Sequence, residues 1–259
     1  MNKETDASAS FSSGIEEAFR KTCKVLLHEE IGELSEFEAF LKRYSSGLME
    51  AKSGISGKKI ACSEPYCGET RFLSYLEASM MKNEPFGINE IKDIDSLFLA
   101  ASERFWYAGN KVLGNSQDVL ESDNCFDSVG IFRSKHIWNV KYAAYCDMVN
   151  FSEYMFGCTH GGEGNSFCMN SSWVSSAIRC FEAGMPIKTS DAYYSHNCNG
   201  CREVIFCFNQ HSKTNAIGNV QLPKEKYFTL KEKILAELVG ILRKDKQAPS
   251  LAEICSGRW

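Results

Sequence analysis

Residues 119–158 read VLESDNCFDSVGIFRSKHIWNVKYAAYCDMVNFSEYMFGC and repeat every six residues. A small residue recurs at this interval, and a bulky or apolar residue mostly stands two places before it. The small residues are Ser122, Ser128, Ser134, Val140, Cys146, Ser152 and Cys158. Residues two apart lie on one face of a strand, so the pattern predicts short strands joined by corners. The repeat therefore predicts a parallel β-solenoid, in which each side stacks on the same side of the next coil.

The repeat continues less regularly beyond this stretch, with interruptions at 159–164 and 184–186. Spacings of 21 and 22 residues separate Cys125, Cys146 and Cys168, which predicts coils longer than three six-residue units. We place the solenoid over residues 111–220.

The flanks of the solenoid have helical patterns, so the fold class is α+β. A serine-rich tail over 1–13 is expected to be disordered, and residues 14–110 form a helical region and cap. Its first helix buries a stripe of Ile15, Phe19, Cys23 and Leu26. Three further helices are predicted, one that begins at Ser35 and two within 70–82 and 93–107. The aromatic run that closes the last of them is expected to plug the open end of the solenoid; it is Phe105, Trp106 and Tyr107.

Residues 221–259 contain a predicted C-terminal capping helix near 224–245, followed by a tail. Leu230, Ile234, Leu238 and Ile241 recur at helical spacing and form its apolar stripe. Since the ends of a solenoid expose unpaired strand edges, a helix at each end is the expected cover.

The composition of the chain limits the classes of function that it suggests. The net charge of −4 and an isoelectric point near 5.8 give no general attraction for nucleic acid. No run is long and apolar enough to span a membrane, and the polar N-terminus does not resemble a signal peptide. We therefore expect a cytoplasmic protein with reduced thiols.

Twelve cysteines are many for such a chain. Because Cys exchanges with Ser and Val in the repeat, the first interpretation is that these thiols are small, buried packing residues. A metal centre is the alternative, with zinc or an iron–sulfur cluster as the cofactor. Its ligands would come from one constellation, His196, Cys198, Cys201, Cys207 and His211.

A second group could support nucleophilic catalysis. Cys158, His160 and Glu163 place a thiol, an imidazole and a carboxylate on one glycine-rich loop. A loop that merely leaves the solenoid is the simpler interpretation, because catalytic partners normally meet through the fold and not as sequence neighbours. An enzyme with its site in a solenoid groove stays as an alternative hypothesis.

The C-terminal half resembles a known group of proteins. Residues 195–209 read SHNCNGCREVIFCFN, and a lysine-rich helix follows Ile217, Gly218 and Asn219. This passage is similar to uncharacterised cysteine-rich repeat proteins of archaea and uncultured bacteria. The resemblance implies a solenoid with a closing helix, and it implies no activity or catalytic residues.

The sequence favours a non-catalytic scaffold or assembly factor that binds a protein partner, because stacked coils present long flat surfaces. The expected contact points are the loop at 159–165 and the break at 184–186. The metal-binding protein and the thiol enzyme are the competing hypotheses. No nucleic-acid or membrane partner is expected.

Overall fold

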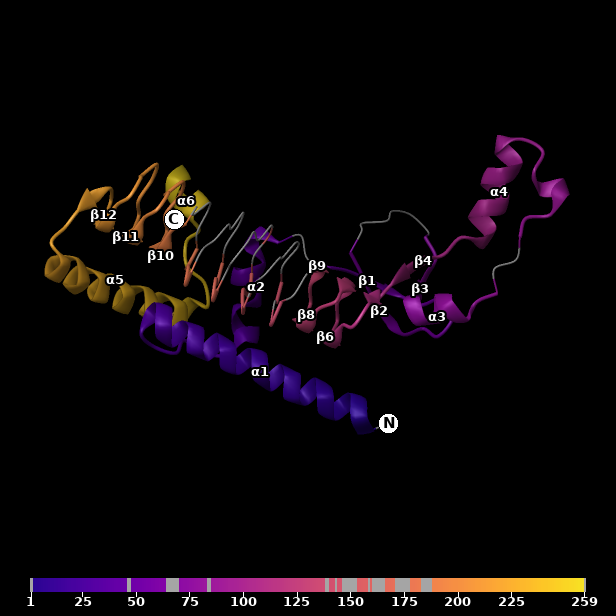
Figure 1. Ribbon diagram of the computed structural model, residues 1–259, viewed down its shortest axis with the longest axis horizontal. Helices are drawn as coiled ribbons and strands as arrows, with labels where there is room; N and C mark the ends of the chain where they lie inside the picture. The colour runs from indigo at the N-terminus through magenta and orange to yellow at the C-terminus, as the bar shows by residue number, and fades with distance from the viewer. Residues whose placement is uncertain are drawn as a thin grey trace.

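In the computed structural model, an elongated β-solenoid carries the long N-terminal and C-terminal helices of the chain along one of its sides (Figure 1). It describes residues 2–45, 48–63, 70–82, 85–137, 140–142, 144–145, 153–157, 159, 166–170, 178–182 and 188–258. The mixed α+β architecture, with N-terminal helices, a central parallel solenoid and a C-terminal helix, is as the sequence predicts.

Parallel strands form the solenoid, and their register is twelve residues except at the first pair, where Val112 lies beside Cys125, thirteen residues later. Its strands are β5 (Val112–Leu113), β6 (Gln117–Leu120), β7 (Asp123–Phe126), β8 (Val129–Phe132), β9 (Lys135–Ile137), β10 (Ser190–Tyr193), β11 (Arg202–Ile205) and β12 (Thr214–Ile217). Gln117 pairs with Val129, and Ser190 pairs with Arg202. The six-residue repeat is therefore half of a coil, and the longer coils expected from the cysteine spacings are wrong.

Inside the coils, the buried positions recur every third residue. Over the best-defined coils they are Thr189, Ala192, Ser195, Cys198, Cys201, Val204 and Cys207. The residue before each of these has a left-handed backbone, with φ between 45° and 63° at Lys188, Asp191, Tyr194, Asn197, Gly200, Glu203 and Phe206. The chain changes direction at each left-handed residue. Because such a residue recurs every third position, four of these corners close one narrow coil of twelve residues.

These corners overturn one prediction, that a bulky residue shares a face with the small residue two places later. Tyr193 faces outward and donates its hydroxyl to the carbonyl of Leu26, at 2.9 Å, in the N-terminal helix. Ser195, two places later, is buried inside the coil. Since left-handed Tyr194 lies between them, strand alternation does not apply.

A hydrogen-bond ladder connects successive coils through the small inward residues. The Ser195 hydroxyl donates to the carbonyl of Tyr193 at 2.9 Å and accepts the N–H of Cys207, twelve residues later, at 3.1 Å. In the same way, the Ser122 hydroxyl donates to the carbonyl of Leu120 and accepts the N–H of Ser134. A thiol can take this place, because Cys201 Sγ donates to Asn199 and accepts the N–H of Lys213 at 3.4 Å.

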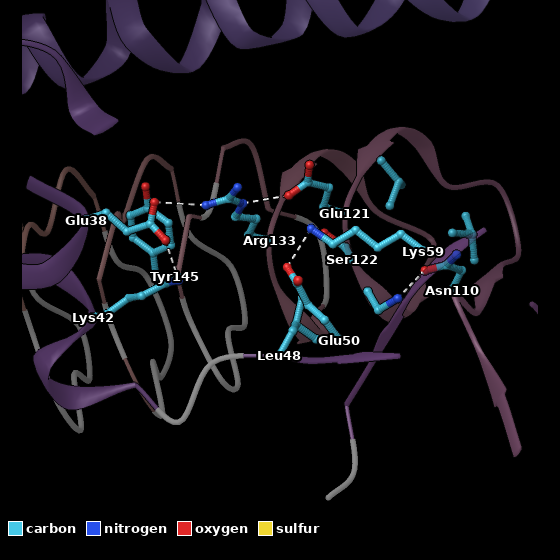
Figure 2. A pocket seen from close by; sticks show the side chains of 13 residues that line it. Glu38, Lys42, Leu48, Glu50, Lys59, Asn110, Glu121, Ser122, Arg133 and Tyr145 are labelled. Carbon is cyan, nitrogen blue, oxygen red and sulfur yellow. Dashed lines mark hydrogen bonds and ion pairs between the residues drawn. The ribbon is translucent and has the colours of Figure 1, made fainter. Parts of the chain in front are cut away.

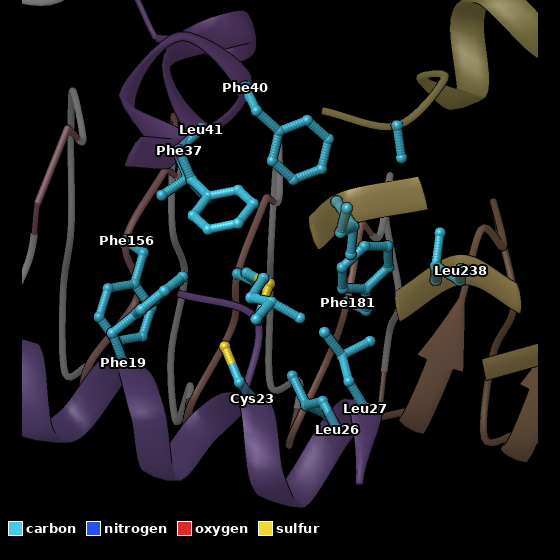
Figure 3. Close-up of a cluster of buried hydrophobic side chains, with 14 of the residues drawn as sticks. Phe19, Cys23, Leu26, Leu27, Phe37, Phe40, Leu41, Phe156, Phe181 and Leu238 are labelled. Atoms are coloured by element: carbon cyan, nitrogen blue, oxygen red, sulfur yellow. The ribbon is translucent and has the colours of Figure 1, made fainter. Parts of the chain in front are cut away.

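Helices cover the outer face on which the bulky residues stack (Figure 3). They are α1 (Asn2–Leu27), η1 (Leu34–Phe37), α2 (Glu38–Leu41) and η2 (Lys42–Tyr44). Phe19 of α1 meets Phe156 edge-on at 5.4 Å, and Phe40 lies 6.4 Å from Phe181. The buried stripe predicted for α1 is confirmed. However, α1 begins at Asn2, so most of the span predicted as a disordered tail is helical.

The C-terminal helix α5 (Lys224–Asp245) lies where it was predicted, but its buried face is rotated. Leu230 and Ile241 are exposed. The buried residues are Tyr227, Lys231, Leu235, Leu238, Val239 and Leu242. Lys231 reaches a coil and pairs with Glu203 at 2.6 Å, an ion pair that the apolar pattern alone does not reveal. Strand β13 (Val220–Gln221) precedes this helix and α6 (Leu251–Ser256) follows it.

The segment before the solenoid is partly stranded. Its elements are β1 (Met49–Lys52), β2 (Lys59–Cys62), β3 (Phe72–Ser74), α3 (Tyr75–Met80), η3 (Ile88–Glu90), α4 (Ile94–Arg104) and β4 (Tyr107–Gly109). Strand β2 lies so close to Gly109 that an added Cβ would come within 2.3 Å of Ile60 Cγ2. The expected aromatic plug is wrong, because Phe105 is exposed and Trp106 lies against Gly54. The β1–β2 hairpin adjoins the first coils instead.

The ladder predicts that Ser195→Ala lowers the free energy of unfolding by about 1–3 kcal/mol, because the buried Cys207 N–H loses its acceptor. Ser195→Cys keeps a donor and an acceptor at this place, so its loss is expected to be clearly smaller. Urea unfolding followed by circular dichroism measures both. A midpoint for Ser195→Ala equal to that of the unmodified protein would contradict the ladder.

Candidate functional site

A groove of about 630 Å³ lies between the β1–β2 hairpin, the first coils and α2 (Figure 2). Three acidic and three basic side chains line it together with apolar and neutral ones. The lining residues are Glu38, Lys42, Leu48, Glu50, Lys59, Ala61, Asn110, Val112, Val119, Glu121, Ser122, Arg133 and Tyr145. Its volume is within the range of ordinary ligand sites.

Arg133 is the central cation of this groove. It follows β8, and its guanidinium pairs with Glu121 at 2.7 Å and with Glu38 at 2.9 Å. Lys42 also pairs with Glu38, at 2.5 Å, and lies over the Tyr145 ring at 5.2 Å. Burial tends to raise the pKa of the Glu38 carboxyl, but the hydrogen bond from Lys42 and the charge of Arg133 outweigh it and lower the pKa. Glu38 therefore stays ionised.

The hairpin forms the opposite wall. Glu50 of β1 and Lys59 of β2 pair at 2.6 Å. The hydrogen bond between them lowers the pKa of Glu50 and raises that of Lys59, so both side chains keep their charge at neutral pH. Apolar side chains of Ala61, Val112 and Val119 lie in the same lining.

Hydrogen bonds hold this wall to the solenoid. The Asn110 side chain accepts the N–H of Ala61 at 2.8 Å, and the N–H of Asn110 donates to the carbonyl of Ala61 at 2.9 Å. The buried Asp123 carboxylate accepts the N–H groups of Ser63 and Lys111, each at 2.7 Å. The groove is therefore preformed. Its residues were missed by sequence reasoning, because they come from four separate segments.

The three cysteines predicted to bind a metal lie in one buried cluster inside the coils, but the two predicted histidines do not join them. Cys198, Cys201 and Cys207 are buried inside the coils, whereas His196 and His211 are exposed on the outside. In the described part of the chain, no group of three or more Cys, His, Asp or Glu side chains is placed to hold a metal ion. Each of the three thiols donates to a backbone carbonyl instead. The arrangement favours packing residues over zinc or iron–sulfur ligands.

The predicted thiol site lies outside the described residues, since Cys158, His160 and Glu163 are not among them. The same holds for 160–165 and 184–186, where partner contacts were expected. The catalytic hypothesis therefore stays a prediction.

A buried carboxyl joins three distant segments and was also missed. Glu182 accepts hydrogen bonds from the Tyr44 hydroxyl and from the N–H of Leu251 at the start of α6. Burial raises the pKa of Glu182 to about 7, although both hydrogen bonds and the nearby Arg43 act to lower it. The sequence carried no signal for this, because Glu182 falls in an irregular part of the repeat.

No family model, no curated protein and no solved structure matches the chain. The resemblance of its C-terminal half to cysteine-rich repeat proteins therefore stays a prediction. Among the helices of the described residues, none has the length and apolar character needed to cross a membrane.

The raised pKa of Glu182 predicts that stability falls as the pH rises. The folded chain holds a proton up to about pH 7, whereas an unfolded glutamate loses it near 4.5. The stabilising difference is complete below about pH 4.5 and disappears as the pH passes 7, a change of about 3 kcal/mol. Glu182→Gln cannot ionise, so urea unfolding at pH 5 and pH 8 is expected to show a smaller change. Equal pH dependence of both proteins would contradict this assignment.

The buried thiols are expected to resist alkylation in the native protein. Only a thiolate reacts readily, and burial raises the pKa of Cys198 to about 11. Iodoacetamide followed by peptide mass spectrometry should modify exposed Cys255 well before Cys198, Cys201 and Cys207. A metal site predicts the opposite, namely that a strong chelator makes these three thiols reactive without unfolding the chain.

Proposed function

We propose that this chain is a non-catalytic scaffold that binds an extended segment of a protein partner in the groove between the β1–β2 hairpin and the solenoid. The observation that carries the proposal is the combination of fixed charges of both signs with apolar lining residues. Polar rims around apolar surface are typical of protein interfaces. Charges of both signs suit a peptide with acidic and basic side chains better than a simple ion.

The electrostatics of the groove favour recognition over proton transfer. The pKa values of Glu38 and Glu50 are lowered, while those of Lys59 and Arg133 are raised. A general acid or base works best with a pKa near the operating pH, and these shifts move away from it. The same fixed charges set the register and orientation of a charged partner.

A preformed groove also keeps the entropic cost of binding low. The hairpin wall is held by the hydrogen bonds of Asn110 and Asp123, and the opposite wall belongs to stacked coils. A rigid receptor loses little conformational freedom when a ligand binds, which favours affinity. We assign this function to the cytoplasm, because the nine described cysteines are all free thiols.

The test is a selection of displayed peptides on the purified protein, followed by affinity measurements on charge-swapped variants. Glu50→Lys combined with Lys59→Glu keeps the ion pair but exchanges the positions of the two charges on the hairpin wall. Selected peptides are expected to bind this variant at least about tenfold more weakly, since attractive contacts become like-charge contacts.

The matched control is Glu17→Lys combined with Lys21→Glu, which swaps an equally exposed pair, 2.7 Å apart, on α1. This control is expected to bind the peptides as tightly as the unmodified protein. The proposal fails if no peptide is selected, or if the swapped groove binds the selected peptides unchanged.

A further inference from the structure

Helix α6 is attached to the solenoid through one buried carboxyl group. Glu182 of the solenoid is 1% exposed, and its Oε1 atom accepts the N–H of Leu251, the first residue of α6, at 2.7 Å. The same atom accepts the hydroxyl of Tyr44 in η2. The other oxygen, Oε2, is also buried and has no hydrogen-bond partner among the described residues. A coil, η2 and α6 therefore meet at one side chain.

This arrangement suits a neutral carboxylic acid better than a carboxylate. Both donors go to Oε1 of Glu182, which leaves Oε2 for the proton. A buried neutral hydroxyl without a partner costs far less free energy than a buried charge. An ionised Glu182 would hold part of its charge on Oε2, where neither water nor a described donor reaches it. The closed position of α6 therefore favours the protonated form.

The charged and titratable groups that face Glu182 do not compensate for its ionisation. Arg43 of η2 acts in favour of a charge on Glu182, but its guanidinium pairs with Glu253 of α6 at 3.5 Å. Glu253 itself repels a charge on Glu182. Burial raises the pKa of the Tyr44 and Tyr194 hydroxyls well above its usual range, so both stay neutral. Ionisation of Glu182 is therefore accommodated best by contact with water.

Helix α6 is the element that can give way to water. It has six residues, and none of them is buried. Its segment is held to the rest of the chain through Glu182 and through Arg43, which donates to the carbonyl of Ala248 at 2.9 Å. The coils, in contrast, are closed by their ladder, and η2 continues directly from α2. Segments with few buried contacts open at the lowest cost in free energy.

We propose that residues 248–258 form a pH-sensitive latch, which is closed on the solenoid while Glu182 is protonated and opens when Glu182 releases its proton to water. In the opened state the carboxylate is hydrated and the coils stay folded. This proposal concerns a fluctuation of one segment and does not depend on the function proposed for the groove.

The latch forms part of an apolar cavity of about 300 Å³ between α5, α6 and the coils. Pro249 and Ile254 supply the side that belongs to the latch. The other walls include Tyr193, Tyr194, Ile205, Phe206, Ile234 and Leu238. Because opening removes one side, the latch controls the access of water and of small apolar molecules to this cavity.

The direction of the pH response follows from the two states of Glu182. Burial raises its pKa to about 7 in the closed state, although the hydrogen bonds from Tyr44 and Leu251 lower it, whereas the hydrated carboxyl has its ordinary pKa of 4.5. The latch is therefore closed most firmly below about pH 4.5, where both states hold the proton. Its opening constant rises tenfold per pH unit from there to pH 7, about 300-fold in all, and is constant at higher pH.

Hydrogen exchange of the full chain, followed by mass spectrometry, tests the latch. Protection factors are corrected for the intrinsic pH dependence of exchange and compared at pH 5 and pH 8. Those of α6 are expected to fall by about 70-fold over this range, which follows from the two pKa values of Glu182. Helix α6 is also expected to exchange faster than α5 at both pH values. Exchange of both helices at one rate would mean that α6 opens only when the whole chain unfolds, and would overturn the latch.

Two variants test whether Glu182 carries the response. Glu182→Gln keeps an acceptor for both donors but cannot ionise, so the protection of its α6 is expected to be independent of pH. Tyr44→Phe removes a hydrogen bond that lowers the pKa of Glu182, so the fall in protection is expected to move to higher pH. An unchanged fall in Glu182→Gln, or an unchanged pH range in Tyr44→Phe, would overturn the proposal.

The matched control is Glu237→Gln, which removes an exposed carboxyl of α5 beside the same cavity. It is expected to show the same fall in protection as the unmodified chain. Glu182, Tyr44 and Glu237 do not line the charged groove, so this proposal and the proposed function can fail separately.

Discussion

The fold depends on one repeated hydrogen-bond arrangement. An inward hydroxyl or thiol donates to the carbonyl two residues before it and accepts the N–H twelve residues after it, as Ser195 does with Tyr193 and Cys207. A coil this narrow turns at a left-handed residue every third position, and such turns leave backbone groups that need partners. The small side chain supplies them from inside. This requirement explains why Ser, Thr and Cys occupy these places, since each is short and carries a donor that also accepts.

The same arrangement gives the cysteines their chemical character. A thiol that donates to a carbonyl inside a closed coil is protonated, and burial opposes its ionisation, as at Cys198 and Cys207. The thiols inside the coils therefore act as packing residues, and the side chains available for binding lie on the outside of the coils. There the solenoid acts as a rigid support: one face carries α1, α2 and α5, and the first coils meet the hairpin to form a charged groove. Helix α4 lies beyond both and extends away from the body of the molecule (Figure 1).

Much of the architecture could be read from the repeat. The six-residue spacing, the stripe of α1 and the limits of α5 follow from local periodicity, which depends on a few neighbouring residues. The same reasoning failed where a left-handed residue broke the alternation, as at Tyr194, because φ at a residue other than glycine leaves little trace in sequence. It failed again at Lys231, whose burial depends on Glu203 in a distant coil.

By itself, the sequence determined that this chain is a solenoid with helical ends, because stacking of identical short units is encoded wherever the unit repeats. Only the tertiary structure decided which side chains meet. It separated the thiols from His196 and His211, and it assembled the groove from Glu50, Lys59 and Arg133. It also left Ile94 and Phe98 of α4 exposed. The reason is physical: a site joins residues that are distant in the chain, and their distances are set by how whole elements pack.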